Sequence, residues 1–509
     1  MTTVAPVTGE SVSDGIDALR AALGRRLAVV AEVLGVDVDG VGTSEALDRV
    51  SRAAQASGEA RHAWLLYVGV TATFPSVAQV SALRRELLLA RPATAVVAVL
   101  RSTMDVQSRT HSGLRTIEIA RDTVLVDVDF CAKHEHNTGI QRVVRHTVPE
   151  WQDERAVAHR LVAWNQDSTG YRDLTDRQLD RVLHWGDRRL EPAGDPVLTD
   201  SDLRREHVVV PWDSVLVVAE VPAFHVLDAL SSIARFSGNA VDLIGYDAIP
   251  LVSADSQPPA ESERFAHYLT LVKHARRVYG ISESASAEFA GFVAALPSQG
   301  LTGPEVVPVT LATEVPAAAR AAAAAVSPTP GAVPLLLCVG SHEPRKNQDA
   351  VLFAAEALHR EGHRFRIVFV GGGSRTATSR FDHEVARLSK EGMAVVSHRR
   401  LGDRELWGLF GRARFSVFVS LHEGFGLPVA ESMALGVPVV TSDFGSLDEI
   451  ARAGGCLQVD PRDDDAVLGA MRRLLTDDEL HAELVTAIAA QQPKTWRSYA
   501  DEIWTGIES

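Results

Sequence analysis

Residues 416–440 read SVFVSLHEGFGLPVAESMALGVPVV, and this stretch decides the fold. The β-branched and aromatic run at its start predicts a strand, and the glycines that follow predict a tight turn. Pro428 suits the first turn of a helix, where a missing N–H costs no hydrogen bond. We therefore expect Glu423 at the end of a strand and Glu431 in the first turn of the next helix. In an open α/β sheet, ligands bind beyond the carboxyl ends of the strands.

The two carboxylates indicate the kind of ligand. Turn amides and the helix dipole together form a site for an anion such as a diphosphate. Carboxylates beside such a site are unfavourable unless they address a neutral group. Sugar hydroxyls are the natural candidates, because an ionised carboxylate accepts hydrogen bonds strongly. The alternative is an ordinary strand–helix connection that carries two surface acids.

The stretch resembles a known signature. Two glutamates eight positions apart, with Gly-Phe-Gly-Leu-Pro between them, are similar to the motif of retaining glycosyltransferases of family 4. The resemblance implies an α/β chain with the GT-B fold, in which two Rossmann-like lobes face a cleft. It implies that Glu423 contacts the donor sugar and that Glu431 holds the ribose hydroxyls of the nucleotide. The turn residues expected to touch the donor with them are Gly424, Phe425, Gly426 and Leu427.

A second strand–loop–helix unit lies upstream. The apolar run 335–340 precedes SHEPRKNQ at 341–348, which places Arg345 and Lys346 just before a helix. Two cations at that point can neutralise a diphosphate, because Arg offers a bidentate fork and Lys a compact charge. The run resembles a segment of many mannosyl- and rhamnosyltransferases of the same family. Many of these have an arginine where this chain has Ser341, so we take Arg345 to supply that charge.

Further turns complete the expected donor site. Gly340 ends the strand before the two cations, and RIVFVGGGS at 366–374 predicts another strand that ends at Gly371. In the family this glycine turn lines the nucleotide cleft. The segment after the next strand packs against the donor base in the family, which makes His398 and Arg399 candidate neighbours of the base. Their residue types do not reveal which base.

The amino-terminal side of the core contains a loop that could reach the donor and a pair of aspartates that could suggest a metal site. The segment 137–145 predicts a loop that opens into a helix, with Thr138 as N-cap and Gly139 as a close-approach turn. It resembles the first loop–helix of the family's acceptor domain, which lies over the donor phosphates. Asp127 and Asp129 could suggest a metal site, because glycosyltransferases of another fold bind a metal through Asp-x-Asp. Their alternation within a β run favours a strand end instead, so no metal site is expected.

A third resemblance concerns the segment VDLIGYDAIPL at 241–251. It is similar to a His-Asp-Leu-Ile-Pro-Leu segment of the same subfamily, whose histidine approaches the outer hydroxyls of the donor sugar. Tyr246 replaces that histidine here, and tyrosine cannot act as a base near neutral pH. Asp247 is retained, and we expect its carboxylate to face the acceptor or the donor sugar.

The chain of 509 residues is long enough for about three domains. Alanine-rich sequence at 317–326, followed by Pro and Gly at 327–334, predicts a hinge between two lobes. Helical periodicity before about residue 120 does not fit a lobe and predicts a helical accessory domain. The expected division is a helical domain at 1–120, an acceptor lobe at 121–315, a hinge linker at 316–334, a donor lobe at 335–490 and a final helix at 491–509 that crosses back to the first lobe.

Composition narrows the partners and the compartment. A net charge of −15 argues against nucleic acid as a partner. Three scattered cysteines and a start without an apolar segment predict a cytoplasmic protein. Because Arg345 and Lys346 can do the neutralising that a metal would do, no metal or other cofactor is expected. Local basic patches are compatible with contact to anionic lipids at the inner face of the membrane, and the helical domain is a candidate for binding a protein partner.

Together the resemblances predict transfer of a hexosyl residue from a nucleoside diphosphate sugar, with retention at the anomeric carbon. Mannose, and hence GDP-mannose, is the favoured donor. The expected acceptor is an oligosaccharide, a polysaccharide or a lipid-linked glycan. Three alternatives stay open: a nucleotide-sugar epimerase, a sucrose- or trehalose-type synthase, and a non-catalytic scaffold that binds sugar nucleotides. Tyr246 in place of the histidine is the argument for the scaffold.

Overall fold

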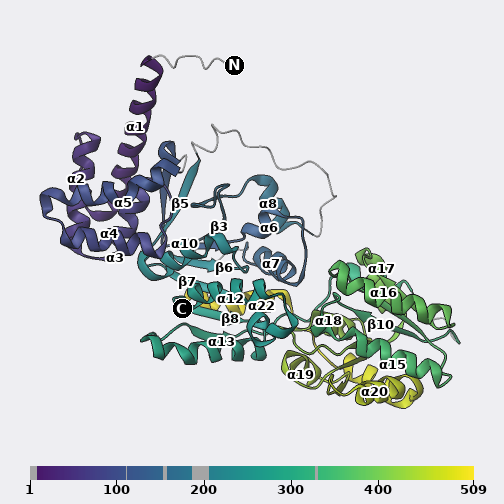
Figure 1. Cartoon of the computed structure of the whole chain (residues 1–509). Coiled ribbons are helices and arrows are strands. Elements are labelled where there is room, and N and C mark those ends of the chain that lie inside the picture. The colour runs from purple at the N-terminus through teal and green to yellow at the C-terminus, as the bar shows by residue number, and fades with distance from the viewer. Residues whose placement is uncertain (1–8, 110–111, 153–157, 186–205, 327–330) are drawn as a thin grey trace.

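The computed structural model describes residues 9–109, 112–152, 158–185, 206–326 and 331–509. Within these residues the strands form two sheets, one of nine strands and one of six. Figure 1 shows a helical region at one end of the molecule, the larger sheet in the middle and the smaller sheet at the other end. The predicted α/β class, with two lobes and a helical region ahead of them, is therefore confirmed.

The helical region packs directly onto the first lobe. Its helix α3 (Ala60–Thr71) is buried on every side, and Trp64 and Val68 share one core with strand residues such as Val209. Trp64 Nε1 also donates a hydrogen bond to Ser232 Oγ of the lobe at 3.0 Å. The surrounding helices of this region are α1 (Gly9–Leu34), α2 (Thr43–Ser57), α4 (Val77–Leu89) and α5 (Ala95–Arg109).

The first sheet has the order β1-β5-β4-β3-β2-β6-β7-β8-β9. Strand β4 runs antiparallel to its neighbours, and the other pairings are parallel. The strands are β1 (Thr116–Arg121), β2 (Val124–Asp127), β3 (His159–Trp164), β4 (Tyr171–Asp173), β5 (His207–Trp212), β6 (Val215–Val218), β7 (Ala240–Gly245), β8 (Arg277–Gly280) and β9 (Glu305–Pro308). A domain border at residue 120 falls inside β1, which is the edge strand of this sheet.

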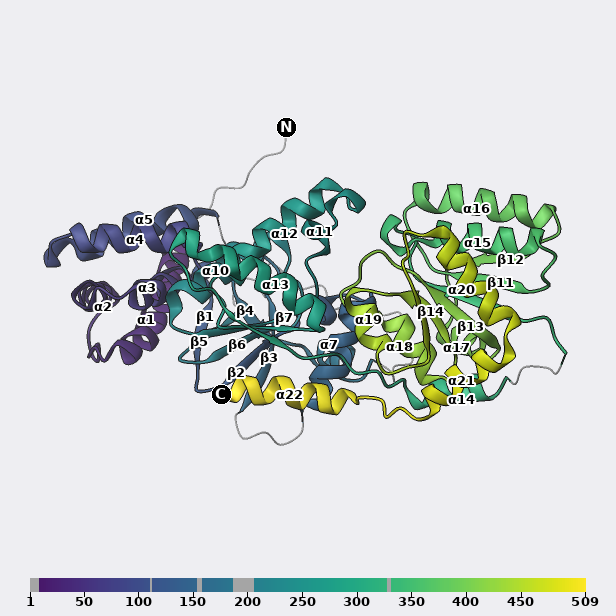
Figure 2. The same cartoon turned by 90° about the horizontal axis from the view of Figure 1, so that it is seen from below.

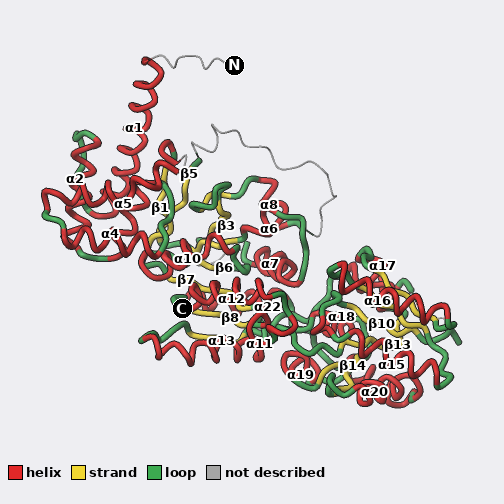
Figure 3. Tube along the Cα trace, viewed as in Figure 1, coloured by secondary structure: helices red, strands yellow, loops and turns green. Residues whose placement is uncertain are grey.

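Helices lie on both faces of the first sheet, as Figure 3 shows. Because both faces are covered, its central strands are continuous apolar runs, and all four residues of β2 are buried. The helices of this lobe are α6 (Asp129–Lys133), α7 (Gly139–Glu150), α8 (Asp176–Leu183), α10 (Leu227–Ser232), α11 (Ile249–Val252), α12 (Pro259–Val272) and α13 (Glu283–Ala295).

The second sheet is parallel throughout, with the order β12-β11-β10-β13-β14-β15. The chain starts at β10, adds strands on one side, and then adds the remaining strands on the other side. The order therefore reverses between β10 and β13, which makes this the topological switch point where such sheets bind ligands. The strands are β10 (Leu335–Val339), β11 (Arg366–Val370), β12 (Ala394–His398), β13 (Ala413–Phe418), β14 (Val439–Ser442) and β15 (Cys456–Val459).

The helices of the second lobe include one from the predicted hinge. Helix α14 (Ala317–Ala324) packs through Ala319 against Trp407 and Phe410, so the alanine-rich part of 316–334 lies on the donor lobe. Residues 327–330 of that linker lie outside the described residues. The other helices are α15 (Gln348–Arg360), α16 (Arg375–Lys390), α17 (Asp403–Phe410), α18 (Leu427–Ala434), α19 (Gly445–Ala451), α20 (Asp464–Thr476) and α21 (Asp478–Ala489).

The chain crosses between the lobes twice, and the two crossings touch. Thr313 N donates to Lys494 O at 3.0 Å. After the second crossing, helix α22 (Trp496–Glu508) lies on the first lobe, where Trp151 Nε1 donates to Ala500 O at 3.0 Å. Among the described residues, we find no helix with the length and apolar character that a bilayer span needs.

Candidate active site

The loops that follow β10 and β13 meet at the switch point. Lys346 Nζ lies 2.6 Å and 2.8 Å from the two carboxylate oxygens of Glu423. Arg345 Nη1 lies 3.0 Å from Glu423 Oε2 and also donates to His422 O at 3.0 Å. The strand order explains this meeting, because β10 and β13 are neighbours although the two loops are far apart in sequence.

The charges at this place stabilise the ionised forms of Glu423 and Arg345. The side chain of Glu423 is 8% exposed. Its burial alone would raise the pKa, but Lys346 and Arg345 outweigh that effect and hold the pKa of Glu423 below its ordinary value. Burial alone would lower the pKa of Arg345, but Glu423, Glu343 and Asp247 raise it. The result is a fixed, buried arrangement of charge at the ligand-binding end of the sheet.

The glycine turn after Glu423 fits closely against the first lobe. A Cβ on Gly424 would lie 2.5 Å from Tyr246 O and 3.0 Å from Asp247 Oδ2, so only glycine allows this approach. Gly426 adopts φ 117° and caps α18, and Phe425 is buried. The turn is thus one of the points at which the donor lobe contacts the predicted acceptor lobe.

The prediction that Glu431 lies in the first turn of the helix is wrong. Helix α18 begins at Leu427, because Gly426 is held in a left-handed conformation, and Glu431 is therefore in the second turn. Its buried side chain forms an ion pair with Arg142 of α7, in the other lobe. Sequence analysis did not single out Arg142, although it lies within the quoted segment 137–145.

The loop before α7 lies beside this pair. Thr138 is the N-cap of α7, as expected, and its N–H donates to Gln141 Oε1 at 3.2 Å. A Cβ on Gly139 would lie 4.0 Å from Leu427 Cδ1, which places this turn against the start of α18. Gly139 and Arg142 thus bring the start of α7 into contact with the donor lobe.

Asp247 and Tyr246 occupy the first-lobe side of the same contact. Asp247 is half-buried, and loss of solvent around its carboxylate raises its pKa to about 6 although Arg345 opposes the shift. Tyr246 donates its hydroxyl to Ala219 O at 2.7 Å, so that hydroxyl is bound within its own lobe. A further residue that sequence analysis missed is His422, whose Nε2 lies 2.6 Å from Glu288 Oε1 and whose Nδ1 lies 2.7 Å from Ser253 Oγ.

The predicted neighbours of the nucleotide come together in the second lobe. A Cβ on Gly371 would lie 1.8 Å from Gly340 O, so the two turns pack backbone to backbone. Gly371 N donates to His398 O at 2.9 Å, and Arg399 Nη1 donates to Gly371 O at 3.2 Å. The Ser341 hydroxyl donates a hydrogen bond to Glu343, and Ser341 does not supply the positive charge of the arginine found there in many family members. The contact of these residues with a base stays a prediction.

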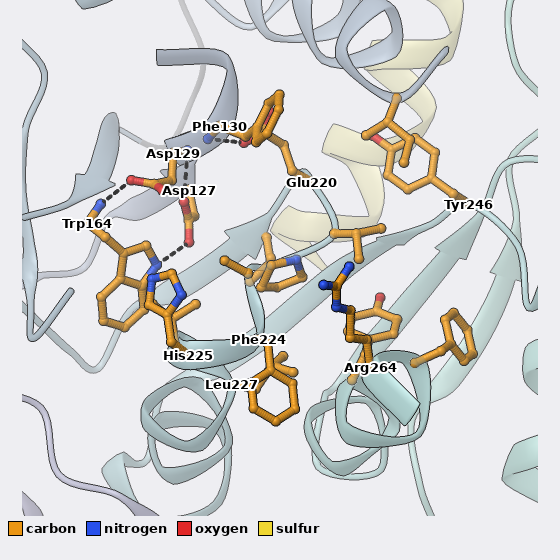
Figure 4. Close-up of a pocket in the computed structure, with 18 of the residues that line it drawn as sticks. Asp127, Asp129, Phe130, Trp164, Glu220, Phe224, His225, Leu227, Tyr246 and Arg264 are labelled. Atoms are coloured by element: carbon orange, nitrogen blue, oxygen red, sulfur yellow. Dashed lines mark hydrogen bonds between the residues drawn. The ribbon is translucent and has the colours of Figure 1, made fainter. Parts of the chain in front are cut away.

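A cavity of about 770 Å³ opens in the first lobe next to Asp247. Figure 4 shows carboxylates on one wall and aromatic rings around the space. Glu220 accepts hydrogen bonds from Phe130 N at 2.7 Å and Cys131 N at 2.9 Å. Burial raises the pKa of Glu220 to about 7. The cavity was not predicted, because its wall comes from segments that are distant in sequence.

Asp127 and Asp129 are also in the wall of this cavity, and protein groups occupy their oxygens. Asp127 ends β2 and accepts from Trp164 Nε1 at 3.0 Å and from Tyr171 OH at 2.8 Å. Asp129 begins α6, accepts from Trp164 N at 2.8 Å and pairs with Lys133 at 2.6 Å. Over the described residues, His, Cys, Asp and Glu side chains form no group of three suited to a metal ion.

Comparison with known proteins places the second lobe in a family. Residues 320–491 match the family model described as "Glycosyl transferases group 1". O-antigen chain mannosyltransferase B of Escherichia coli is 37% identical over 161 residues, which cover 31% of this chain and 41% of that protein. Serotype-specific mannosyltransferase WbdA of Escherichia coli is 26% identical over 347 residues, or 65% of this chain and 40% of that protein. The chain thus spans about two fifths of the length of these curated relatives.

Solved structures share the fold at low identity. The N-terminal domain of trehalose-6-phosphate phosphatase from Candida albicans aligns with a TM-score of 0.53 at 13% identity. The alignment covers 76% of this chain and 97% of that chain. The trehalose-6-phosphate synthase of Burkholderia multivorans aligns with a TM-score of 0.51 at 12% identity, over 76% and 97% of the two chains. The second lobe thus matches the group 1 glycosyltransferases over residues 320–491, and the likeness to these structures shows that the chain has the GT-B fold.

Proposed function

We propose that this chain transfers a hexosyl residue, with mannose favoured, from a nucleoside diphosphate sugar to a glycan or glycolipid with retention of anomeric configuration. One observation carries the proposal: Glu423 is held ionised between Lys346 and Arg345 at the switch point of the second sheet. The names of the Escherichia coli relatives support mannose, and hence GDP-mannose as donor.

The charges at this site match the demands of the reaction. Departure of a nucleoside diphosphate develops negative charge, and Lys346 and Arg345 are fixed cations that can stabilise it. The turn amides at Phe425 and Gly426 precede α18, whose dipole adds to the same effect. Glu423 then remains to accept hydrogen bonds from hydroxyls of the sugar. In this scheme the leaving phosphate takes the acceptor's proton, and no covalent glycosyl-enzyme forms.

The cavity of the first lobe is the proposed acceptor site. It reaches Tyr246 and Asp247, and these same residues contact Gly424 of the donor lobe. An acceptor in the cavity would therefore lie next to the donor sugar. Carboxylates and aromatic rings in its wall suit sugar hydroxyls and the apolar faces of sugar rings.

A ligand screen tests the donor site. Thermal unfolding should be followed with GDP-mannose, UDP-glucose, UDP-GlcNAc and dTDP-rhamnose, for wild type and Lys346→Ala. A donor present at 100 times its dissociation constant should add about 2.7 kcal/mol to the free energy of unfolding. We expect stabilisation of wild type by GDP-mannose, loss of that stabilisation in Lys346→Ala, and no loss in Lys390→Ala on the exposed end of α16. Equal stabilisation of Lys346→Ala would show that the donor binds elsewhere.

Turnover then tests the reaction itself. GDP-mannose is incubated with mannooligosaccharide acceptors, and NMR of the product gives the anomeric configuration. We expect an α-linked product, and an unchanged rate after treatment with EDTA, since the proposal needs no metal. An inverted product or a metal requirement would contradict these parts of the proposal. Conversion of the donor sugar with no acceptor present would instead identify an epimerase.

A further inference from the structure

The helical region carries an exposed apolar surface on its outer side. In α4, Leu88 is 56% exposed and Leu89 is 87% exposed. Each lies four residues after an exposed arginine, Arg84 or Arg85, and therefore on the same face of the helix. The opposite face of α4 packs through Leu83 and Leu87 into the core of the region, so the two leucines point away from it.

Helix α5 continues this surface. Val97, Leu100 and Met104 are spaced at three and four residues and share the outward face of α5, with Met104 65% exposed. Arg101 is exposed beside them. The inward face of α5 packs through Val99 into the same core as α4.

Helices α4 and α5 follow one another in the chain and share one core, and each turns its exposed apolar side chains away from that core. Figure 2 shows the two helices next to each other at the outer edge of the helical region. We name this surface, formed by Arg84, Arg85, Leu88, Leu89, Leu100 and Met104, the α4–α5 outer face.

The charge of the α4–α5 outer face is opposite to that of the whole chain. Residues 77–104 contain four arginines and one glutamate, which gives +4 − 1 = +3. The whole chain carries −15. Exposed leucines interleaved with arginines are the pattern of a helix that lies in the surface of a membrane, because apolar side chains enter the acyl boundary while arginines meet anionic headgroups.

We propose that the α4–α5 outer face docks on a lipid surface that carries anionic headgroups. A second copy of the chain is a poorer occupant, because a twofold contact would bring the arginines of the two faces together. The helical region lies at the end of the molecule remote from the second lobe, so docking there leaves the second lobe away from the lipid surface.

Vesicle sedimentation with the full chain tests the proposal. The probes are vesicles of phosphatidylcholine alone and vesicles of equal parts phosphatidylcholine and phosphatidylglycerol. We expect wild type to bind only the second kind, and more weakly as salt rises. The double variant Leu88→Ser, Leu89→Ser should lower the partition coefficient at least about tenfold. The favourable free energy of transferring two leucine side chains from water into the lipid is lost in this variant. Arg84→Gln with Arg85→Gln should lower it about fivefold per arginine.

A matched variant controls for general hydrophobicity. Phe353→Ser removes another half-exposed apolar side chain, on α15 of the second lobe, and should bind vesicles as wild type does. Thermal unfolding of each variant should match wild type, since every substituted side chain is exposed. The proposal is overturned if wild type sediments equally with both kinds of vesicle, or if the α4 variants bind like wild type. A concentration-dependent dimer that the α4 variants abolish, without vesicle binding, would also overturn it. None of these outcomes depends on whether the chain transfers mannose.

Discussion

Arg142 on α7 and Glu431 on α18 form an ion pair that joins the two lobes. Glu431 is the carboxylate expected to hold the ribose of the donor, and its side chain is only 6% exposed. This buried carboxylate of the second lobe is thus paired with a cation from the first lobe. If ribose takes the carboxylate oxygen that Arg142 occupies, as we propose, then Arg142 competes with the nucleotide.

Removal of Arg142 should make the nucleotide stabilise the protein more strongly than it stabilises wild type. Arg142→Ala leaves Glu431 buried without its cation, which should lower the free energy of unfolding by about 1–3 kcal/mol. Ribose hydroxyls can then supply the missing hydrogen bonds, so GDP should raise the melting temperature of the variant more than that of wild type. Arg452→Ala is the matched control, since Arg452 pairs with Glu283 across the lobes in an exposed position and should cost at most about 1 kcal/mol. An equal GDP effect in wild type and Arg142→Ala would contradict the competition.

Glu423 should separate donor affinity from turnover. Glu423→Gln keeps the shape of the side chain but removes the counter-charge of Lys346 and Arg345. We expect GDP to bind more tightly, because both cations become available to the diphosphate, while kcat falls because the charge that faces the sugar is lost. Isothermal titration and steady-state kinetics measure the two effects. Glu479→Gln on the exposed surface of α21 should change neither. Weaker GDP binding by Glu423→Gln would show that its carboxylate does not restrain the cations.

Lys346 should matter for rate as well as affinity. Loss of one charged donor to a developing oxyanion costs about 10²–10³-fold in kcat, and Lys346→Ala removes such a donor. Lys346→Arg keeps the charge but not the compact geometry, so we expect partial recovery. Steady-state kinetics at saturating donor make the comparison. A variant Lys346→Ala with kcat within a few-fold of wild type would exclude a role in leaving-group stabilisation.

The pH dependence of activity should report Asp247. Its pKa is raised to about 6, mainly by burial, so the carboxylate is protonated below that pH and ionised above it. If the ionised form positions a hydroxyl, kcat/KM should rise with pH and level off above about pH 6. Asp247→Asn should lower kcat/KM and remove this acid limb. Glu220→Gln is the control, because burial raises the pKa of Glu220 to about 7 and its loss should leave the limb near pH 6 in place. An acid limb that survives Asp247→Asn would belong to another group.

A methyl group at Gly424 should disturb the contact between the lobes without unfolding either one. The Cβ of Gly424→Ala would lie 2.5 Å from Tyr246 O, and the lobes would have to separate to admit it. A displacement of about 1 Å at a reacting centre can cost about 10²-fold in rate, so kcat/KM should fall by about that factor. Gly291→Ala on α13 has no atom within 4 Å of its new methyl group and should keep full activity. Full activity of Gly424→Ala would mean that this approach is not required in catalysis.

The strand–turn–helix units that carry Glu423 and Lys346 could be predicted from the sequence, because each motif follows a strand of one parallel sheet. Glu423 and Lys346 are 77 residues apart, yet the strand order places their loops side by side. Arg142 and Glu431 are 289 residues apart and belong to different lobes. Their meeting depends on how the lobes close, and no local pattern encodes that. His422 was missed for the same reason, since its partners Ser253 and Glu288 lie in the first lobe.

The helical region shows where periodicity stops being informative. Helical periodicity before about residue 120 predicted helices here, and α3, with its buried Trp64, Leu65 and Val68, is one of them. Periodicity gives no sign of what covers these buried side chains. The cover is the first sheet, with Val208 and Val210 of β5 in one core with the helix. Helical periodicity alone could therefore suggest a separate domain, while the packing joins the region to the lobe.

The shared core around α3 has a consequence for how such a chain can be divided. If the chain were cut near residue 115, the first sheet would lose the cover over β5 and expose Val208, Val210 and Trp212 to water. Exposed apolar strands of this kind pair with other chains and aggregate. Recombination could thus not add the helical region to the first lobe, or remove it, and leave that lobe properly covered. The helical region has to be inherited together with the lobe that it covers.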